Sequence, residues 1–326
     1  MTPVTSPTPQ FTAPLLAPAR LAALLDGPAA GPARPVVLDV RWRLGGPSGR
    51  ADHEAGHVPG AVFVDLDTEL AAPPGEGGRH PLPAPGTLQD ALRRAGVCGE
   101  SRVVVYDDDT GAVAARAWWL LRWAGLPGDR VAVLDGGFRA WVAEGLPVTA
   151  SPTRTAQGDV VVHPGGMPVV DADGAAELAR RGVLLDARAG ARYRGEIEPV
   201  DARAGHVPGA RNAPATEHLG ADGRWLRPDA VAARYTALGV GSPDRGTTEP
   251  AEPGAEPPQA PRPEPTDPGG VDVGVYCGSG VNATAVVLAL EYAGLRPSTH
   301  PAALYAGSWS QWSADPRRPV ATGSAP

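Results

Sequence analysis

The sequence predicts an α/β protein of two similar domains, each with a central parallel β-sheet and helices on both faces. One set of short sequence blocks occurs twice in the same order. Between these blocks, short Val- and Leu-rich runs alternate with longer Ala-, Leu- and Arg-rich stretches, as is typical of buried parallel strands joined by helices. The chain has 326 residues, and because a domain commonly has roughly 150 residues, two domains are expected.

The first half of each copy contains a strand and a turn block. An apolar run with the ending Asp-x-Arg occupies residues 36–41 in the first copy and 183–188 in the second. The sequence Gly-His-Val-Pro-Gly-Ala follows at 56–61 and again at 205–210, an offset of 149 residues. Short apolar runs of this kind predict fully buried strands.

The second half of each copy contains a further strand, a helix and an aromatic block, with an offset of 170 or 171 residues between the copies. The Ala-rich stretches end near Gly125 and Gly294, and a glycine at this place is a typical helix stop. The predicted strands, helices and aromatic blocks of the two copies are 103–106 and 273–276, 112–124 and 283–293, and 137–141 and 308–312.

The change in offset marks an insertion in the second copy. Segment 242–270 is dense in Pro, Gly and Glu, which predicts a disordered insert. We interpret it as a tolerated surface insertion, because long loops cost little stability, and we expect no contact with the active site. A partner-binding or gating loop is the alternative. The predicted domains are 13–150 and 168–322, joined by a linker at 151–167.

Composition and charge exclude several classes of protein. The net charge is −7, which disfavours nucleic-acid binding. The sequence contains no apolar run of about 18 residues and no basic amino-terminal segment, so neither a membrane span nor a secretory signal is expected. Two cysteines, Cys98 and Cys277, are too few for a disulfide framework. We therefore expect a cytoplasmic protein without membrane or nucleic-acid partners, in which Cys98 has a structural role.

Cys277 is the strongest candidate for a catalytic residue. It follows the predicted strand 271–276 and precedes the Gly-Ser-Gly-Val-Asn loop 278–282 and a helix. In open α/β sheets ligands bind where a strand leads into a helix. Loop N–H groups and a helix N-terminus stabilise an anion there, which favours a reactive thiolate. An inert cysteine and a phosphate-binding loop are the alternatives. A cysteine phosphatase is disfavoured, because Ala283 stands where that class needs an arginine.

Several motifs together resemble the tandem-domain rhodanese family of sulfurtransferases. These motifs are the two His-Val-Pro-Gly-Ala blocks, the Tyr276-Cys277 junction and the Gly-Phe and Gly-Ser-Trp blocks near the end of each copy. The resemblance covers nearly the whole chain and implies that the second domain alone is catalytic. It also implies that Cys277 accepts a sulfane sulfur as a persulfide and passes it to cyanide, a small thiol or thioredoxin. Neither a cofactor nor a metal ion is expected.

The catalytic loop indicates the sulfur donor. Loops that read Cys-Gly-Ser-Gly-Val-Thr resemble 3-mercaptopyruvate sulfurtransferases, whereas Cys-Arg-Lys-Gly-Val-Thr resembles thiosulfate sulfurtransferases. The present loop follows the first pattern through Gly278, Gly280 and Val281 and departs from it at Asn282. These four residues are predicted to bind the substrate through neutral donors. A thiosulfate:cyanide sulfurtransferase is the alternative. A second alternative is a non-enzymatic sulfur carrier, or a module that binds a partner through the 242–270 insert.

The resemblance also implies two substrate-binding arginines, Arg188 and Arg192. A planar guanidinium group can bind a carboxylate through two parallel hydrogen bonds, which suits an anionic donor. Arg194 lies close to them in the sequence. A surface role is the alternative, since the chain has 29 basic residues.

A proton relay is implied for enzymes of the mercaptopyruvate type. In this chain Ser279, His57 and Asp52 are the predicted members, which would protonate the enolate that leaves when sulfur is transferred. The alternative for His57 is a structural role, because His206 stands at the matching position of the second copy.

The first copy has an acid where the second has its cysteine. Asp107 matches Cys277, and a carboxylate cannot form a persulfide. The first domain is therefore predicted to be catalytically silent and to form one wall of the cleft. The run 107–109 consists of three aspartates, which we interpret as a solvated turn, with a metal site as the alternative.

Overall fold

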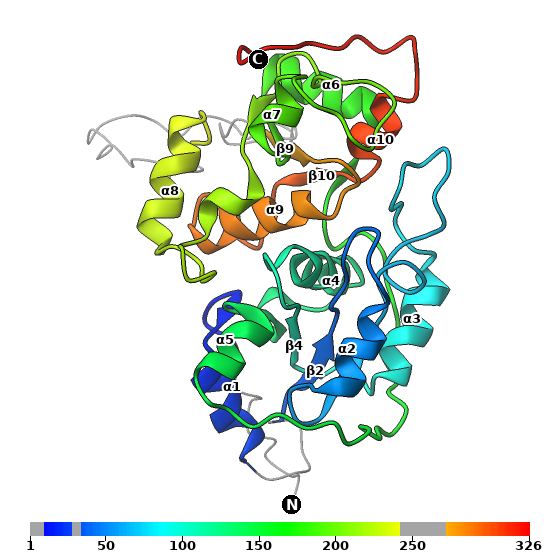
Figure 1. The fold of residues 1–326 in the computed structure, drawn as a ribbon, viewed down its shortest axis with the longest axis vertical. Coiled ribbons are helices and arrows are strands. Elements are labelled where there is room, and N and C mark those ends of the chain that lie inside the picture. Colours follow the sequence, from blue (N-terminus) through cyan, green and yellow to red (C-terminus); the bar gives the residue numbers. More distant parts are fainter. Residues whose placement is uncertain (1–9, 28–33, 242–271) are drawn as a thin grey trace, which may run out of the picture.

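The computed structural model describes residues 10–27, 34–241 and 272–326. The predicted insert at 242–270 lies outside these residues. Figure 1 shows two lobes, one above the other along the longest axis. The first half of the chain forms the lower lobe and the second half forms the upper lobe.

The lower lobe is built on a five-stranded parallel sheet with the order β1-β5-β4-β2-β3. Every residue of the central strand is buried, as expected for a parallel sheet with helices on both faces. The strands are β1 (Leu15–Leu16), β2 (Val36–Asp39), β3 (Ala61–Phe63), β4 (Val103–Tyr106) and β5 (Val131–Leu134). The helices are α1 (Pro18–Leu25), α2 (Gly49–Ala55), α3 (Pro85–Arg94), α4 (Ala112–Trp123), the 3₁₀ turn η1 (Gly128–Arg130) and α5 (Gly137–Ala143).

The upper lobe repeats this plan with the order β6-β10-β9-β7-β8, again with every pair parallel. Its strands are β6 (Val169–Val170), β7 (Val183–Asp186), β8 (Arg211–Asn212), β9 (Val273–Tyr276) and β10 (Ala303–Tyr305). Its helices are α6 (Ala172–Arg181), α7 (Gly190–Tyr193), the 3₁₀ turn η2 (Ala215–His218), α8 (Pro228–Ala237), α9 (Asn282–Tyr292) and α10 (Ser308–Trp312).

The two sheets share their register as well as their order. Asp39 at the end of β2 pairs with Tyr106 of β4, and Asp186 at the end of β7 pairs with Tyr276 of β9. The predicted fold of two α/β domains with parallel sheets is therefore confirmed. Because both copies end their central strand at the same sheet edge, the residues that follow β4 and β9 occupy equivalent places.

Helices α4 and α9 lie against each other where the lobes meet (Figure 1). Every residue of α4 is buried, as are residues 283–290 of α9. A helix that is covered on all sides belongs to a shared core. One apolar cluster accordingly contains Trp118 and Trp119 of α4 together with Val286 and Leu290 of α9. Within the described ranges, no helix is long and apolar enough to cross a bilayer.

Candidate active site

A cavity of about 400 Å³ lies between the lobes, beside the loops that follow β4 and β9. Both lobes line it, so the prediction that the first domain forms one wall is confirmed. The first lobe contributes Trp42, Arg43, Arg79, His80, Asp107 and Asp109, among others, and the second contributes Arg188, Arg192, Cys277, Gly278, Ser279, Val281 and Asn282. Of the predicted loop residues, Gly280 shapes the turn behind this wall.

The loop after β9 curls around the sulfur of Cys277. The Gly280 N–H donates to Cys277 Sγ over 3.1 Å, and the cysteine is 2% exposed. Gly280 has φ +81°, and a Cβ there would lie 2.5 Å from the carbonyl oxygen of Ala306. Only glycine fits this position, because a side chain would meet both the positive φ and the neighbouring backbone. The loop therefore aims a backbone donor at the sulfur.

Ser308 holds the same loop from behind and was not identified from the sequence. Its hydroxyl accepts the Cys277 N–H over 3.1 Å and donates to the Tyr305 carbonyl over 2.9 Å. Ser308 has φ +53°, the one positive φ outside glycine among the described residues. The matching residue of the first copy, Gly137, has φ +57°. A serine in this conformation costs about 1–3 kcal/mol, which is typical of functional sites.

In the first copy, a carboxylate occupies the space inside the equivalent loop. Both carboxylate oxygens of Asp107 accept backbone N–H groups, so this acid sits inside a ring of amides. The donors are Asp109, Gly111, Val113 and Ala114, at 3.0 to 3.1 Å.

The second copy has one backbone donor to its cysteine, the Gly280 N–H. The N–H groups of Ser279 and Val281, which correspond to those of Asp109 and Gly111, have no acceptor in the part of the chain that the structure describes. These N–H groups belong to the loop that follows the sulfur, and loop amides of this kind can bind an anion.

The arginine predicted first for substrate binding, Arg188, is occupied by other partners. Its guanidinium binds both oxygens of Asp186 at 2.6 to 3.1 Å and the Gly205 carbonyl at 2.7 Å. Arg41 makes the same bonds to Asp39 in the first lobe. Burial lowers the pKa of Arg188, but Asp186 outweighs it and holds the pKa above its usual value. Because both copies share this pair, the contacts of Arg188 indicate a structural role. Arg188 also lines the cavity, so its binding of substrate stays a prediction.

Arg192 remains available at the cavity. Glu198 accepts from its Nε at 3.3 Å and from its Nη2 at 2.6 Å, and Asp201 accepts from the same Nη2 at 2.8 Å. Its Nη1 has no partner among the described residues and lies near Gly278. Arg194 pairs with Glu196, away from the lining of the cavity.

A different histidine from the predicted one reaches Ser279. His80 Nδ1 lies 2.8 Å from Ser279 Oγ, and its Nε2 lies 3.4 Å from Asp67. Asp67 also accepts the indole N–H of Trp42 over 2.8 Å. Burial lowers the pKa of His80 to about 4, although Asp67 opposes this shift. The ring is therefore neutral at pH 7 and forms a Ser279–His80–Asp67 chain at the cavity.

The expectation that His57 and Asp52 complete the relay does not hold in the structure. His57 is buried, stacks on the His53 ring at 3.9 Å and bonds the His53 carbonyl at 2.7 Å. His206 does the same with Tyr193, at 3.8 Å and 2.8 Å. Asp52 pairs with Arg43. A shared structural role in the two repeats, the alternative considered for His57, explains this histidine. His80 carries no comparable repeat signal and lies in a Pro- and Gly-rich stretch.

Arg116 is a buried cation that sequence reasoning also missed. It is fully buried in α4, and its Nη1 donates to the Gly280 carbonyl at 3.4 Å. Its other bonds go to the carbonyls of Leu70, His80 and Pro81. Burial lowers the pKa of Arg116 to about 10, and the charge of the Cys277 thiolate opposes this. No carboxylate in the described ranges pairs with Arg116. The nearby thiolate is therefore its natural counter-charge.

Comparison with known proteins agrees with this architecture. The Rhodanese-like domain family matches residues 17–144 and 171–315. A Pseudomonas aeruginosa protein named a probable 3-mercaptopyruvate sulfurtransferase is 44% identical, over 96% of this chain and 99% of its own length. A Mycobacterium tuberculosis protein provisionally named a thiosulfate sulfurtransferase is 42% identical, over 89% of this chain and 91% of its own. A crystal structure of SseA from Escherichia coli, described as a 3-mercaptopyruvate sulfotransferase, has a TM-score of 0.70 at 28% identity. It matches 92% of this chain and 100% of that one.

The duplicated fold, the cysteine loop between the lobes and these similarities define the class of the protein. The chain belongs to the rhodanese family, with two tandem copies of the domain. It is an enzyme, a sulfurtransferase.

Proposed function

We propose that this enzyme moves a sulfane sulfur from 3-mercaptopyruvate to a thiophilic acceptor through a persulfide on Cys277. The observation that carries the proposal is the Cys277 loop, in which a buried sulfur accepts the Gly280 N–H and the N–H groups of Ser279 and Val281 have no acceptor among the described residues. Relatives named for 3-mercaptopyruvate support this choice of donor. The neutral side chains of the loop agree with it as well.

In the first half-reaction the Cys277 thiolate attacks the sulfur of the donor. A sulfur–sulfur bond forms and the carbon–sulfur bond breaks, so that its electron pair remains on pyruvate as the enolate. The thiol proton of the donor balances the step, because the persulfide ionises while the enolate carbon takes up one proton. Backbone N–H groups of Ser279, Gly280 and Val281 stabilise the outer sulfur anion, as oxyanion holes stabilise oxygen.

Ser279 and His80 stabilise the negative charge that develops on the leaving group. The Ser279 hydroxyl lies next to the nucleophile and can donate to the oxygen on which enolate charge develops. The neutral His80 ring, 2.8 Å from that hydroxyl, exchanges a proton with it. Asp67 fixes the orientation of the ring from the other side.

In the second half-reaction an acceptor thiolate or cyanide attacks the outer sulfur and restores the Cys277 thiolate. We propose cyanide, small thiols and thioredoxin as acceptors, because each supplies a soft nucleophile. The cavity between the lobes provides their access.

Thiosulfate is the second candidate donor. The relative from Mycobacterium tuberculosis carries that name, and two arginines with free donor groups, Arg79 and Arg192, line the cavity. Guanidinium groups bind sulfonate-like anions as well as carboxylates. An assay in which the two donors compete therefore identifies the preferred one.

The test measures thiocyanate formed from cyanide, with 3-mercaptopyruvate and thiosulfate as competing donors. We expect 3-mercaptopyruvate to win by about tenfold or more in kcat/KM, a difference of about 1.4 kcal/mol in transition-state stabilisation. Cys277→Ser is expected to abolish transfer, whereas Cys98→Ser is the matched control that retains it. Full activity in Cys277→Ser would reject the persulfide, and a preference for thiosulfate would reject the donor.

A further inference from the structure

We propose that Arg79, a residue of the first domain, forms with Arg192 of the second domain a two-armed site for the carboxylate of the sulfur donor. We call this pair the arginine clamp. The inference deepens the proposed function and rests on its assumption that the donor carries a carboxylate. It assigns half of substrate recognition to the first domain, which has Asp107 where the second domain has Cys277.

Asp201 accepts hydrogen bonds from both arginines of the clamp. Asp201 Oδ1 accepts from Arg79 Nη1 at 2.7 Å, and Asp201 Oδ2 accepts from Arg192 Nη2 at 2.8 Å. Asp201 is 3% exposed and is also held by the Glu198 carboxylate, which accepts the Asp201 N–H at 3.0 Å. A buried carboxylate whose two oxygens both accept charge-assisted hydrogen bonds is held in one position. It therefore sets the spacing of the two guanidinium groups.

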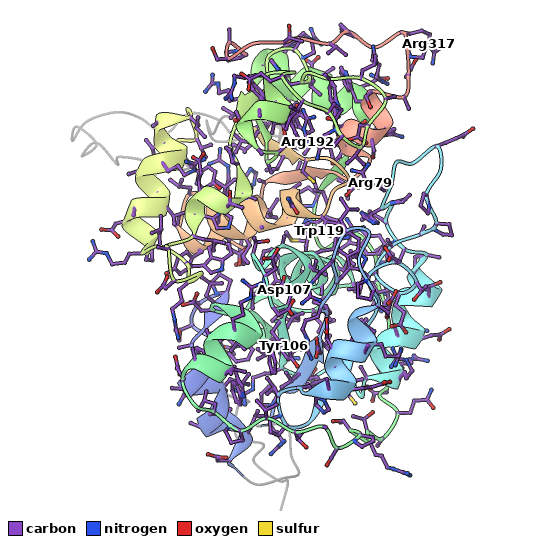
Figure 2. The ribbon with its side chains drawn as sticks, in the orientation of Figure 1. Arg79, Tyr106, Asp107, Trp119, Arg192 and Arg317 are labelled. Carbon is purple, nitrogen blue, oxygen red and sulfur yellow. The ribbon has the colours of Figure 1, made fainter. Side chains whose placement is uncertain are left out.

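Each arginine of the clamp has a guanidinium nitrogen without a partner among the described residues, and this nitrogen lies close to the residue that follows the nucleophile. A Cβ placed on Gly278 would lie 3.0 Å from Arg79 Nη2 and 3.5 Å from Arg192 Nη1. Neither nitrogen has a partner among the residues described, and Arg79 Nε is buried without one. Gly278 directly follows Cys277 in the chain. An anion that reaches the sulfur thus meets two guanidinium groups that each keep N–H donors without a partner among the described residues, and guanidinium donors favour a carboxylate. Figure 2 shows Arg79 and Arg192 near the junction of the lobes.

Arg79 is fixed on the second domain although it belongs to the first. Its backbone N–H donates to Ser310 Oγ at 3.0 Å. At the preceding residue, Gly78, a Cβ would lie 2.6 Å from the Gly307 carbonyl oxygen, and φ is +99°. Only glycine allows this close approach. The segment is therefore pressed onto the catalytic domain, which makes Arg79 a built part of the cavity rather than a mobile surface residue.

The kinetic test compares Arg79→Met with the native enzyme. Because methionine keeps part of the apolar stem but removes the charge, we expect KM for 3-mercaptopyruvate to rise by about tenfold or more, with kcat changed by less than roughly threefold. KM for cyanide should stay unchanged. Arg317→Met is the matched control, since Arg317 lies at the outer edge of the second lobe in Figure 2 and pairs with Asp315. An unchanged KM in Arg79→Met would overturn the clamp.

A second test does not depend on turnover. In a Cys98→Ser background, Cys277 is alkylated with iodoacetate, which carries a carboxylate, and with the neutral analogue iodoacetamide. Arg79→Met should lower the ratio of the iodoacetate rate to the iodoacetamide rate by about fivefold or more, while Arg317→Met leaves it unchanged. An equal loss with both reagents would show a structural defect and would overturn the clamp.

The two tests separate the clamp from the proposed function. If the native enzyme forms no pyruvate from 3-mercaptopyruvate but the alkylation ratio falls in Arg79→Met, the clamp is supported and the proposed donor is wrong. If the native enzyme uses 3-mercaptopyruvate but neither KM nor the ratio responds to Arg79→Met, the proposed donor is supported and the clamp is wrong.

Discussion

The loop after β4 and the loop after β9 occupy the same place in their lobes but have opposite chemistry. In the first, the Asp107 carboxylate fills the ring of amides with an anion of its own. In the second, Cys277 leaves the amides of Ser279 and Val281 without an acceptor among the described residues. The comparison teaches that the fold supplies an anion site in both copies. The residue at the strand end decides whether the amides are occupied by a carboxylate of the chain or keep free donors.

A second difference concerns the helices behind the loops. Arg116 of α4 matches Val286 of α9 by the same offset of 170 residues, and only the arginine carries charge. Arg116 bonds the Gly280 carbonyl of the other lobe. The first domain thus supplies a cation to the Cys277 loop as well as a wall of the cavity.

The largest expected effect comes from copying the first loop into the second. Cys277→Asp should lower sulfur transfer by at least about 10³-fold, because the nucleophile is lost and the anion site is filled. The variant should still fold, since Asp107 shows that an acid fits this loop. Thiocyanate assays and thermal unfolding measure the two properties. Retained transfer would contradict the comparison, and Asp107→Asn serves as the control that keeps turnover.

Next in size is the relay. His80→Asn should lower kcat with 3-mercaptopyruvate by about 10²-fold, because Ser279 loses its proton partner. In the native enzyme, protonation of His80 should reduce the rate as the pH falls through about 4, the pKa to which burial lowers this histidine. A pH–rate profile from pH 3.5 to 8 measures this.

His57→Asn is the matched control for the relay, because this histidine is buried but lies away from the cavity. It should lower stability and leave kcat unchanged. If His57→Asn instead reduced kcat while His80→Asn did not, the relay would be wrongly assigned.

Arg116 is expected to have a smaller effect. Arg116→Met should slow alkylation of Cys277 at pH 7 by about tenfold, because the buried cation that stabilises the thiolate is lost. Arg116→Lys keeps the charge and should restore most of the rate. The rate of reaction with iodoacetamide from pH 5 to 10, in a Cys98→Ser background, measures this effect. Identical profiles for the methionine and lysine variants would show that charge is not the cause.

A further expected effect concerns stability and compares the lobes through one buried histidine in each. Burial lowers the pKa of His80 to about 4 and that of His218 to about 3. Because the unfolded chain binds these protons near pH 6.5, stability falls as the pH drops below that value. Each histidine should cost about 2 kcal/mol between pH 7 and pH 5.

Urea unfolding at the two pH values measures this loss. His218→Gln should remove one such contribution, whereas His163→Gln, at an exposed site, should leave the pH dependence unchanged. An unaltered slope in His218→Gln would contradict the assignment.

Much of the fold was predictable because the repeated sequence blocks mark the same strands, turns and helices in both copies. Buried β-branched strands, glycine stops and the repeated blocks each depend on local sequence, so β4, β9 and the helices after them were placed correctly. Cys277 was found for the same reason, since it stands at a strand end. Its role stays a prediction that the proposed assays test.

The relay and the clamp were not predicted from the sequence, because they depend on contacts between the lobes. His80 and Arg79 lie about 200 residues before the loop they meet, in a stretch without periodic pattern. The contacts of Arg188 could be expected from the repeat. Both copies have the Asp-x-Arg ending, and both use that arginine to hold the carboxylate at the end of a strand.

The shared apolar cluster at the junction has a consequence for how the duplication persists. Trp118, Trp119 and the rest of α4 are shielded from water by the other copy, and α9 is shielded in return. If the chain were divided in the 151–167 segment, each half would expose a broad apolar face, and such faces promote aggregation. The two copies therefore depend on each other for the burial of α4 and α9, and deletion of either copy would expose the helix of the other to water.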